Sequence, residues 1–138
     1  MAPLWRASGG SVASTLRPMG SIRLDSYTLL TLRTGDDPPD LTEEERLRLQ
    51  DAHLSHLADL HEAGHMVAGG PVVHVDPTWR GLVLFRTDEA TALRLMSDDP
   101  LVVAGEFRTE VCTWLMPAEV IVAGPGQLPR SVADVAGR

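Results

Sequence analysis

The chain has 138 residues, enough for one domain with its own core, and hydrophobic residues make up 43% of it. Its net charge is −7, no lysine occurs, and no basic run is present. This acidic balance argues against nucleic acid and against an anionic membrane surface as partners. No stretch approaches the roughly 18 consecutive apolar residues that a membrane helix needs. We therefore expect a soluble, cytoplasmic protein with no membrane association.

The chain begins with a stretch rich in Gly, Ser, Ala and Pro that shows no sustained hydrophobic period. We expect residues 1–25 to be a disordered N-terminal extension, with Met19 as an alternative start. Residues 26–33 mix leucines with β-forming polar residues, which predicts a strand. The turn residues GDDPPD end this strand.

A long amphipathic helix is predicted over about residues 42–63. Thr42 and Glu45 form a capping-box pattern at its start, where glutamates also complement the positive end of the helix dipole. One stripe of this helix, at about 100° per residue, carries Leu49, Leu57 and Leu60. His53 lies in the middle of that stripe. A titratable imidazole therefore occupies a position where the pattern favours an aliphatic side chain.

Four further elements are predicted in chain order: a strand at 65–75 interrupted at Gly69-Gly70-Pro71, a central strand at 79–86, a helix at 89–96 and a strand at 106–115. Gly64 fits the C′ position that closes the first helix, and Asp88 is the N-cap of the second. The segment LVVAG before the last strand is expected to be a turn. We interpret residues 118–138, with their prolines and glycines, as a C-terminal tail.

The element order β-α-β-β-α-β over residues 26–117 predicts an α+β domain of the ferredoxin-like class. In this fold two helices cover one face of a four-stranded antiparallel sheet. The strands are apolar on both faces, so the face without helices requires another apolar surface. Self-association through that face is the simplest solution, and we expect a homodimer.

The ordered set of segments resembles the YciI-like family, also called YCII-related domain proteins, of the dimeric α+β barrel superfamily. The segments are YTLLTLR at 27–33, AHLSHL at 52–57, AGGP at 68–71, RGLVLFR at 80–86 and DDPLVVAGEF at 98–107. The resemblance implies a ferredoxin-like subunit, a dimer, and a pocket where His53 of the AHL motif faces Asp99 of the DP motif. Val72 departs from the family, which often has an aromatic residue there, and His74 is an extra histidine.

The resemblance also suggests reaction classes. A characterised relative is a dehydrochlorinase that acts on a chlorinated hydroxyhydroquinone, and the wider superfamily includes lactone isomerases and cofactor-free monooxygenases. A carboxylate beside an imidazole stabilises its cationic form and fixes its tautomer, so the pair His53 and Asp99 suits proton abstraction followed by elimination or isomerisation. The alternative is a core histidine bonded to a backbone carbonyl, with Asp99 serving only as the N-cap of the turn at Pro100.

His61, Glu62 and His65 form a literal H-E-x-x-H pattern, which in zinc peptidases requires both histidines on one helical face. The helix is expected to end at Gly64, which moves His65 into the next strand and removes the i, i+4 geometry. We therefore expect no metal site and no cofactor. Cys112, the only cysteine, lies in an apolar strand and is interpreted as a buried structural thiol.

Four residues are candidates for substrate binding: Gly70, Pro71, Arg80 and His56. The Gly-Pro pair lets the backbone approach a ligand closely, although a strand bulge is an equal alternative. Arg80 stands at the entrance of the third strand, where it binds a carboxylate or remains solvated. His56 lies at the edge of the apolar stripe, where it borders the pocket or faces water.

Two functions from different classes follow from these observations. The first is a cofactor-independent lyase or isomerase acting on a small oxygenated ring or lactone, with His53 as the base and Asp99 orienting it. The second is a non-catalytic binding or accessory module that holds a metabolite in the same dimer pocket. A cofactor-free monooxygenase is weaker, because one Tyr and two Phe offer few aromatic side chains to hold an electron-rich substrate.

Overall fold

The computed structural model of the chain describes residues 21–73 and 76–135. Most of the predicted N-terminal extension and the extra histidine His74 therefore lie outside the described residues. Within the described ranges, no helix is long and apolar enough to cross a membrane.

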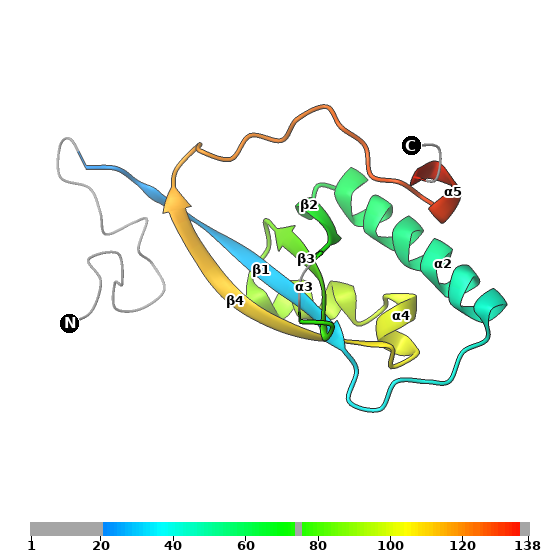
Figure 1. Cartoon of the computed structure of the whole chain (residues 1–138). Coiled ribbons are helices and arrows are strands. Elements are labelled where there is room, and N and C mark those ends of the chain that lie inside the picture. Colours follow the sequence, from blue (N-terminus) through cyan, green and yellow to red (C-terminus); the bar gives the residue numbers. More distant parts are fainter. Residues whose placement is uncertain (1–20, 74–75, 136–138) are drawn as a thin grey trace.

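The described residues form one four-stranded antiparallel sheet (Figure 1). Its strands are β1 (Leu24–Thr34), β2 (Met66–Pro71), β3 (Trp79–Phe85) and β4 (Phe107–Pro117). Their spatial order is β2-β3-β1-β4, so the two long strands β1 and β4 lie side by side and β3 joins them to the short edge strand. This order, with helices between β1 and β2 and between β3 and β4, confirms the predicted α+β, ferredoxin-like class.

The strand boundaries differ from the sequence prediction at two places. β1 starts at Leu24, inside the predicted extension, because it pairs residue for residue with the equally long β4. β2 is not interrupted at its glycines: Gly70 pairs with Leu82 and Pro71 with Gly81. A side chain at Gly81 would place its Cβ 3.1 Å from the Gly70 carbonyl oxygen, so this pairing depends on the small residues.

Helix α2 (Glu43–Glu62) follows β1 and has both predicted ends. Thr42 accepts a hydrogen bond from the Glu45 amide at 3.1 Å, while the Glu45 carboxylate accepts from the Thr42 amide at 3.3 Å, which completes the capping box. Gly64, at φ 84°, and the following His65 donate to the carbonyls of His61 and Leu60. This is the Schellman arrangement that ends a helix with a left-handed glycine.

Helix α3 (Glu89–Met96) is capped by Asp88 as predicted. Hydrogen bonds from the Thr91 side chain and from the Thr91 amide lower the pKa of this exposed carboxylate. The segment expected to be a turn is instead a single helical turn, α4 (Pro100–Val103). It forms because Pro100 occupies the first helical position and Asp99 accepts from the next amides.

The core lies between the sheet and helices α2, α3 and α4. It is built from Leu30, Leu32, Leu57, Leu60, Met66, Val83, Phe85, Ala92, Met96, Leu101 and Phe107. Strand pairing puts Leu30 beside Val83, so both side chains point to the helix-covered face. The alternate residues of the same strands, such as Leu29 and Leu84, occupy the other face.

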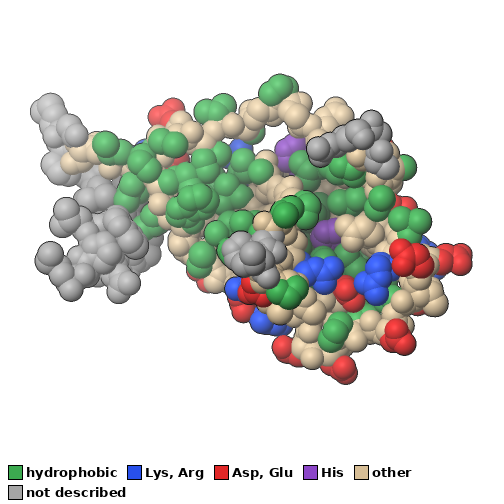
Figure 2. Space-filling view, viewed as in Figure 1, with side chains coloured by type: hydrophobic (Ala, Val, Ile, Leu, Met, Phe, Trp, Pro, Cys, Tyr) green, Lys and Arg blue, Asp and Glu red, His purple; other side chains and the backbone are tan. Residues whose placement is uncertain are grey.

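The sheet face without helices carries partly exposed apolar side chains from three strands, and Figure 2 shows hydrophobic side chains gathered over β1 and β4. Trp114 is 47% exposed there. Cys112 is also exposed, so the interpretation of a buried thiol was wrong. The β4 register pairs Cys112 with Leu29, which places the thiol on the outer face of an edge strand.

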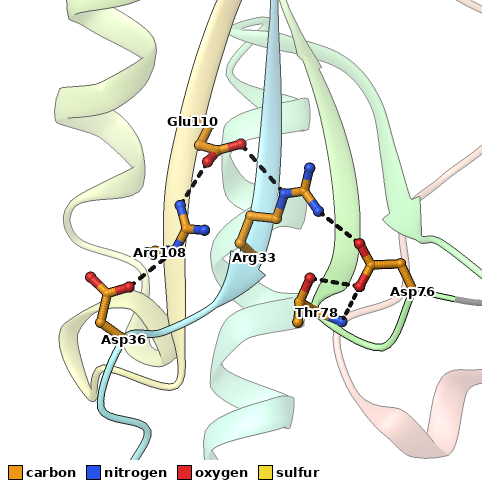
Figure 3. Close-up of polar contacts among 6 residues, drawn as sticks. All are labelled: Arg33, Asp36, Asp76, Thr78, Arg108 and Glu110. Carbon is orange, nitrogen blue, oxygen red and sulfur yellow. Dashed lines mark hydrogen bonds and ion pairs between the residues drawn. The ribbon is translucent and has the colours of Figure 1, made fainter.

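A charged network crosses the end of this outer face where β1 leaves the sheet (Figure 3). It joins Arg33, Asp36, Asp76, Thr78, Arg108 and Glu110. The hydrogen bond from Arg108 lowers the pKa of Glu110, and the same bond raises the pKa of Arg108. These groups are solvent-exposed, so the network is one of screened surface contacts.

Candidate functional site

His53 on α2 and Asp99 at the start of α4 are in direct contact. The His53 Nδ1 lies 2.7 Å from the Asp99 Oδ1, although the residues are 46 positions apart. His53 is 5% exposed and Asp99 is fully buried. The ring of Phe107 meets the imidazole edge-on, with centroids 5.6 Å apart. The expected contact between the imidazole and the carboxylate is therefore present inside an apolar wall.

The second oxygen of Asp99 caps helix α4. Its Oδ2 accepts from the amides of Leu101 at 3.1 Å and Val102 at 3.3 Å. Asp99 is thus both the N-cap of α4 and the hydrogen-bond partner of His53. The hydrogen bonds from these two amides fix the orientation of the carboxylate that contacts the imidazole ring.

An ionised Asp99 can only accept at Oδ1, so Nδ1 of a neutral His53 carries the proton and Nε2 keeps its lone pair. Among the described residues, none bonds to Nε2. His53 also lines a cavity of about 810 Å³. Asp99 therefore holds the imidazole in place through Nδ1, and the lone pair of Nε2 remains available as a base on a ring that lines the cavity.

The cavity lies between α2, strands β2 and β3, and a segment near the C-terminus. Gly70, Pro71 and Arg80, three of the four predicted binding residues, belong to its wall. Most of the remaining wall is apolar and includes Leu32, Leu54, Leu57, Val72, Trp79, Phe107, Leu128 and Val132. A small, mostly apolar ligand fits such a space, with a few polar groups to orient it.

Arg80 reaches the cavity as part of a charged cluster. Its Nη1 lies 3.4 Å from the Glu106 Oε2, which also accepts from Arg46 at 3.2 Å. The guanidinium stacks over Phe107, with its Cζ 4.8 Å from the ring centroid. Two arginines share one buried carboxylate, and of the three groups only Arg80 lines the cavity.

Glu106 was not among the predicted site residues. It is a single glutamate at the start of a strand, and no spacing in the sequence links it to arginines that lie 60 and 26 positions away. Glu106 is 6% exposed in a segment otherwise rich in apolar residues, and the sequence alone gives no signal of this burial. Burial of this kind becomes visible only in the folded chain.

His56 lies away from the cavity and is not one of its lining residues. Its Nε2 is 3.0 Å from the Leu95 carbonyl oxygen, so the ring donates to a carbonyl in the last turn of α3. The prediction that His56 binds substrate is not supported by this placement. His56 is three positions after His53, which places it about 300° further around the helix. The two side chains therefore leave α2 in directions about 60° apart, and only that of His53 reaches the cavity.

The H-E-x-x-H pattern does not form a metal-binding face. His61 is in the last turn of α2, while His65 follows the left-handed Gly64 and belongs to the entry into β2. Glu62 is paired with Arg130. Within the described part of the chain, no three His, Cys, Asp or Glu side chains lie close enough together to hold a metal ion.

These features define a small α+β domain of the ferredoxin-like class with a buried His–carboxylate pair at the edge of an apolar cavity. The family model described as the YCII-related domain matches residues 29–115. The chain therefore belongs to the YCII-related domain family, as the sequence segments predicted. A comparison with curated proteins found no match.

Proposed function

We propose that this protein is a cofactor-independent lyase or isomerase that moves a proton on a small oxygenated ring or lactone. The observation that supports it best is the 2.7 Å contact between His53 Nδ1 and Asp99 Oδ1 at the cavity wall. His53 is the general base, because it is the member of the pair that lines the cavity. Asp99 is a positioning residue, since it acts through the imidazole.

The proton transfer uses the free nitrogen of His53. Its Nε2 takes a proton from a phenol or from a carbon next to a carbonyl, and the electron pair of that bond moves into the ring. Asp99 stabilises the imidazolium that forms. In isomerisation the same proton returns at another carbon. In elimination the electron pair expels a leaving group such as halide, which departs with its bonding electrons, and the His53 imidazolium then gives its proton to water.

The substrate is expected to be anionic, or to become anionic during the reaction. Arg80 carries the excess positive charge of the Arg46–Glu106–Arg80 cluster to the cavity wall. A carboxylate or an oxyanion on the ring would pair with it. Gly70 and Pro71 lie on the same wall and allow a flat ring to approach the backbone of β2.

Two measurements test the proposal: the exchange of substrate hydrogen for deuterium, or the release of chloride, in the presence of the protein, and the tautomer of His53 as seen by NMR. Wild-type protein is expected to exchange a substrate C–H for deuterium, or to release chloride, with at least one member of a panel of lactones and chlorinated hydroxyhydroquinones. In ¹⁵N NMR at neutral pH, His53 should carry its proton on Nδ1. Binding without exchange or release across the panel would favour the alternative, a non-catalytic metabolite-binding module, because the same cavity serves both functions.

We also propose that the protein is a homodimer through the sheet face without helices. Leu29, Leu82 and Leu84 are only half-buried there, and Trp114 is exposed. A second copy would bury this surface, and a stable interface of this kind covers more than about 1,000 Å² in total.

Trp114→Glu is therefore expected to raise the dimer dissociation constant at least about 30-fold, as for an interface hot spot. Analytical ultracentrifugation measures it. The matched control is Leu47→Glu, which changes a similarly exposed apolar residue on α2 and should leave the dimer intact. A wild-type monomer at micromolar concentration would exclude this assembly.

A further inference from the structure

The segment after β4 crosses back over the molecule and ends beside α2, although it was interpreted as a tail (Figure 1). It contains a short helix, α5 (Val132–Val135). Four of its residues line the cavity beside His53: Leu128, Pro129, Val132 and Val135. Leu128 also packs against the core. The segment lies beyond the matched family region, which ends at residue 115.

Arg130 connects this segment to α2. Its Nη1 donates to the Asp59 Oδ1 at 3.0 Å and to the Ser55 Oγ at 3.3 Å, and its Nη2 donates to Glu62. The hydrogen bond to Asp59, together with the attraction of Glu62, raises the pKa of Arg130. One guanidinium therefore bridges three side chains on consecutive turns of α2.

A second connection holds the start of α5. The Val132 amide donates to the Asp51 Oδ1 on α2 at 2.7 Å, and the Arg130 amide donates to the Asp134 carboxylate at 2.8 Å. The face of α2 that carries Asp51, Ser55, Asp59 and Glu62 is therefore the docking face of the C-terminal segment. The hydrogen bonds of Arg130 to α2 lie on the solvent-exposed side of the segment, while Val132 lines the cavity.

We propose that residues 128–135 are a ligand-contacting wall that selects substrates with an apolar substituent opposite their oxygenated edge. The oxygenated edge pairs with Arg80 and His53, and the apolar edge packs on Leu128 and Val132. Arg130 is a positioning residue that holds this wall on α2. The inference rests on the proposed function only in taking the cavity as the ligand site, and it requires no proton transfer.

The probes are benzoate and 4-chlorobenzoate, which differ by one apolar substituent opposite the carboxylate. Their dissociation constants are measured by NMR titration. In wild type, 4-chlorobenzoate should bind about fivefold more tightly, the size expected for burying a methylene-sized group. Val132→Ser and Arg130→Ala should reduce that preference to less than twofold, and Arg130→Lys should restore part of it.

Two control variants show whether a change in ligand preference comes from residues 128–135, from a general loss of stability or from the loss of catalysis. Arg108→Ala removes another arginine that pairs with two carboxylates at similar exposure, but on the outer sheet face, and it should keep the preference. His53→Gln should also keep it, while losing any proton exchange. In Arg130→Ala, the backbone amides of residues 128–135 should exchange their hydrogens with solvent faster than in wild type, while the amides of β1 should exchange at the wild-type rate.

The wall assignment fails if wild type binds neither probe or shows no chloro preference, or if Val132→Ser keeps that preference. The proposed function fails on different evidence, namely the absence of proton exchange or halide release in wild type.

Discussion

Replacing Asp99 with alanine is expected to lower the free energy of unfolding by about 2–4 kcal/mol. The fully buried carboxylate accepts from two amides of α4 and from His53. Loss of an N-cap costs about 1 kcal/mol, and a buried donor left without an acceptor costs roughly 1–3 kcal/mol more. Urea unfolding followed by circular dichroism measures the change.

Two variants show which part of this loss belongs to the His53 contact. Asp88→Ala removes the same kind of cap from α3, but its carboxylate is exposed and has no histidine partner, so a smaller loss is expected. Asp99→Asn keeps an oxygen to cap α4 and should retain most of the stability. A loss in Asp99→Ala no larger than that in Asp88→Ala would show that the buried contact contributes little.

His53→Gln is expected to reduce turnover by about 10²–10⁴-fold with little change in KM, because it removes the general base and leaves the cavity wall in place. Asp99→Asn should reduce turnover too, since a neutral partner no longer stabilises the imidazolium or holds the proton on Nδ1. Steady-state kinetics on the substrate found in the exchange screen measures both.

The matched control for this prediction is His56→Gln. It changes the same residue type on the same helix, but its ring bonds the Leu95 carbonyl and lies outside the cavity wall. Turnover should stay within about threefold of wild type, because surface changes away from a site have small effects. A His53→Gln variant with full turnover would end the assignment of this residue as the base.

Much of the fold could be predicted because its signals are local. The capping box at Thr42, the left-handed Gly64 and the cap at Asp88 each act within one helical turn, and all three are present in the structure. The same locality predicted that His61 and His65 do not share a helical face, and α2 does end at Glu62, before His65. Local hydrogen bonding thus decided element types and helix ends.

Predictions failed where a residue's surroundings come from a distant element. Cys112 sits in an apolar run, yet its pairing with Leu29 turns it to the outer face. A strand alternates faces with period two, and only pairing with the neighbouring strand decides which face is buried. The place of His56 outside the cavity wall is likewise set by a distant element, because the Leu95 carbonyl of α3 supplies its partner.

The order of the four strands with α2 and α3, the caps of these two helices and the unusual histidine in an apolar stripe were determined by the sequence alone, because each depends on periodicity or on hydrogen bonds between near neighbours. The pairing of His53 with Asp99 could be expected only through the family resemblance. The charge cluster around Glu106 and the wall at residues 128–135 were decided by tertiary structure. Their contacts join residues 26 to 81 positions apart, and no local pattern records which distant side chains the packed core will bring together.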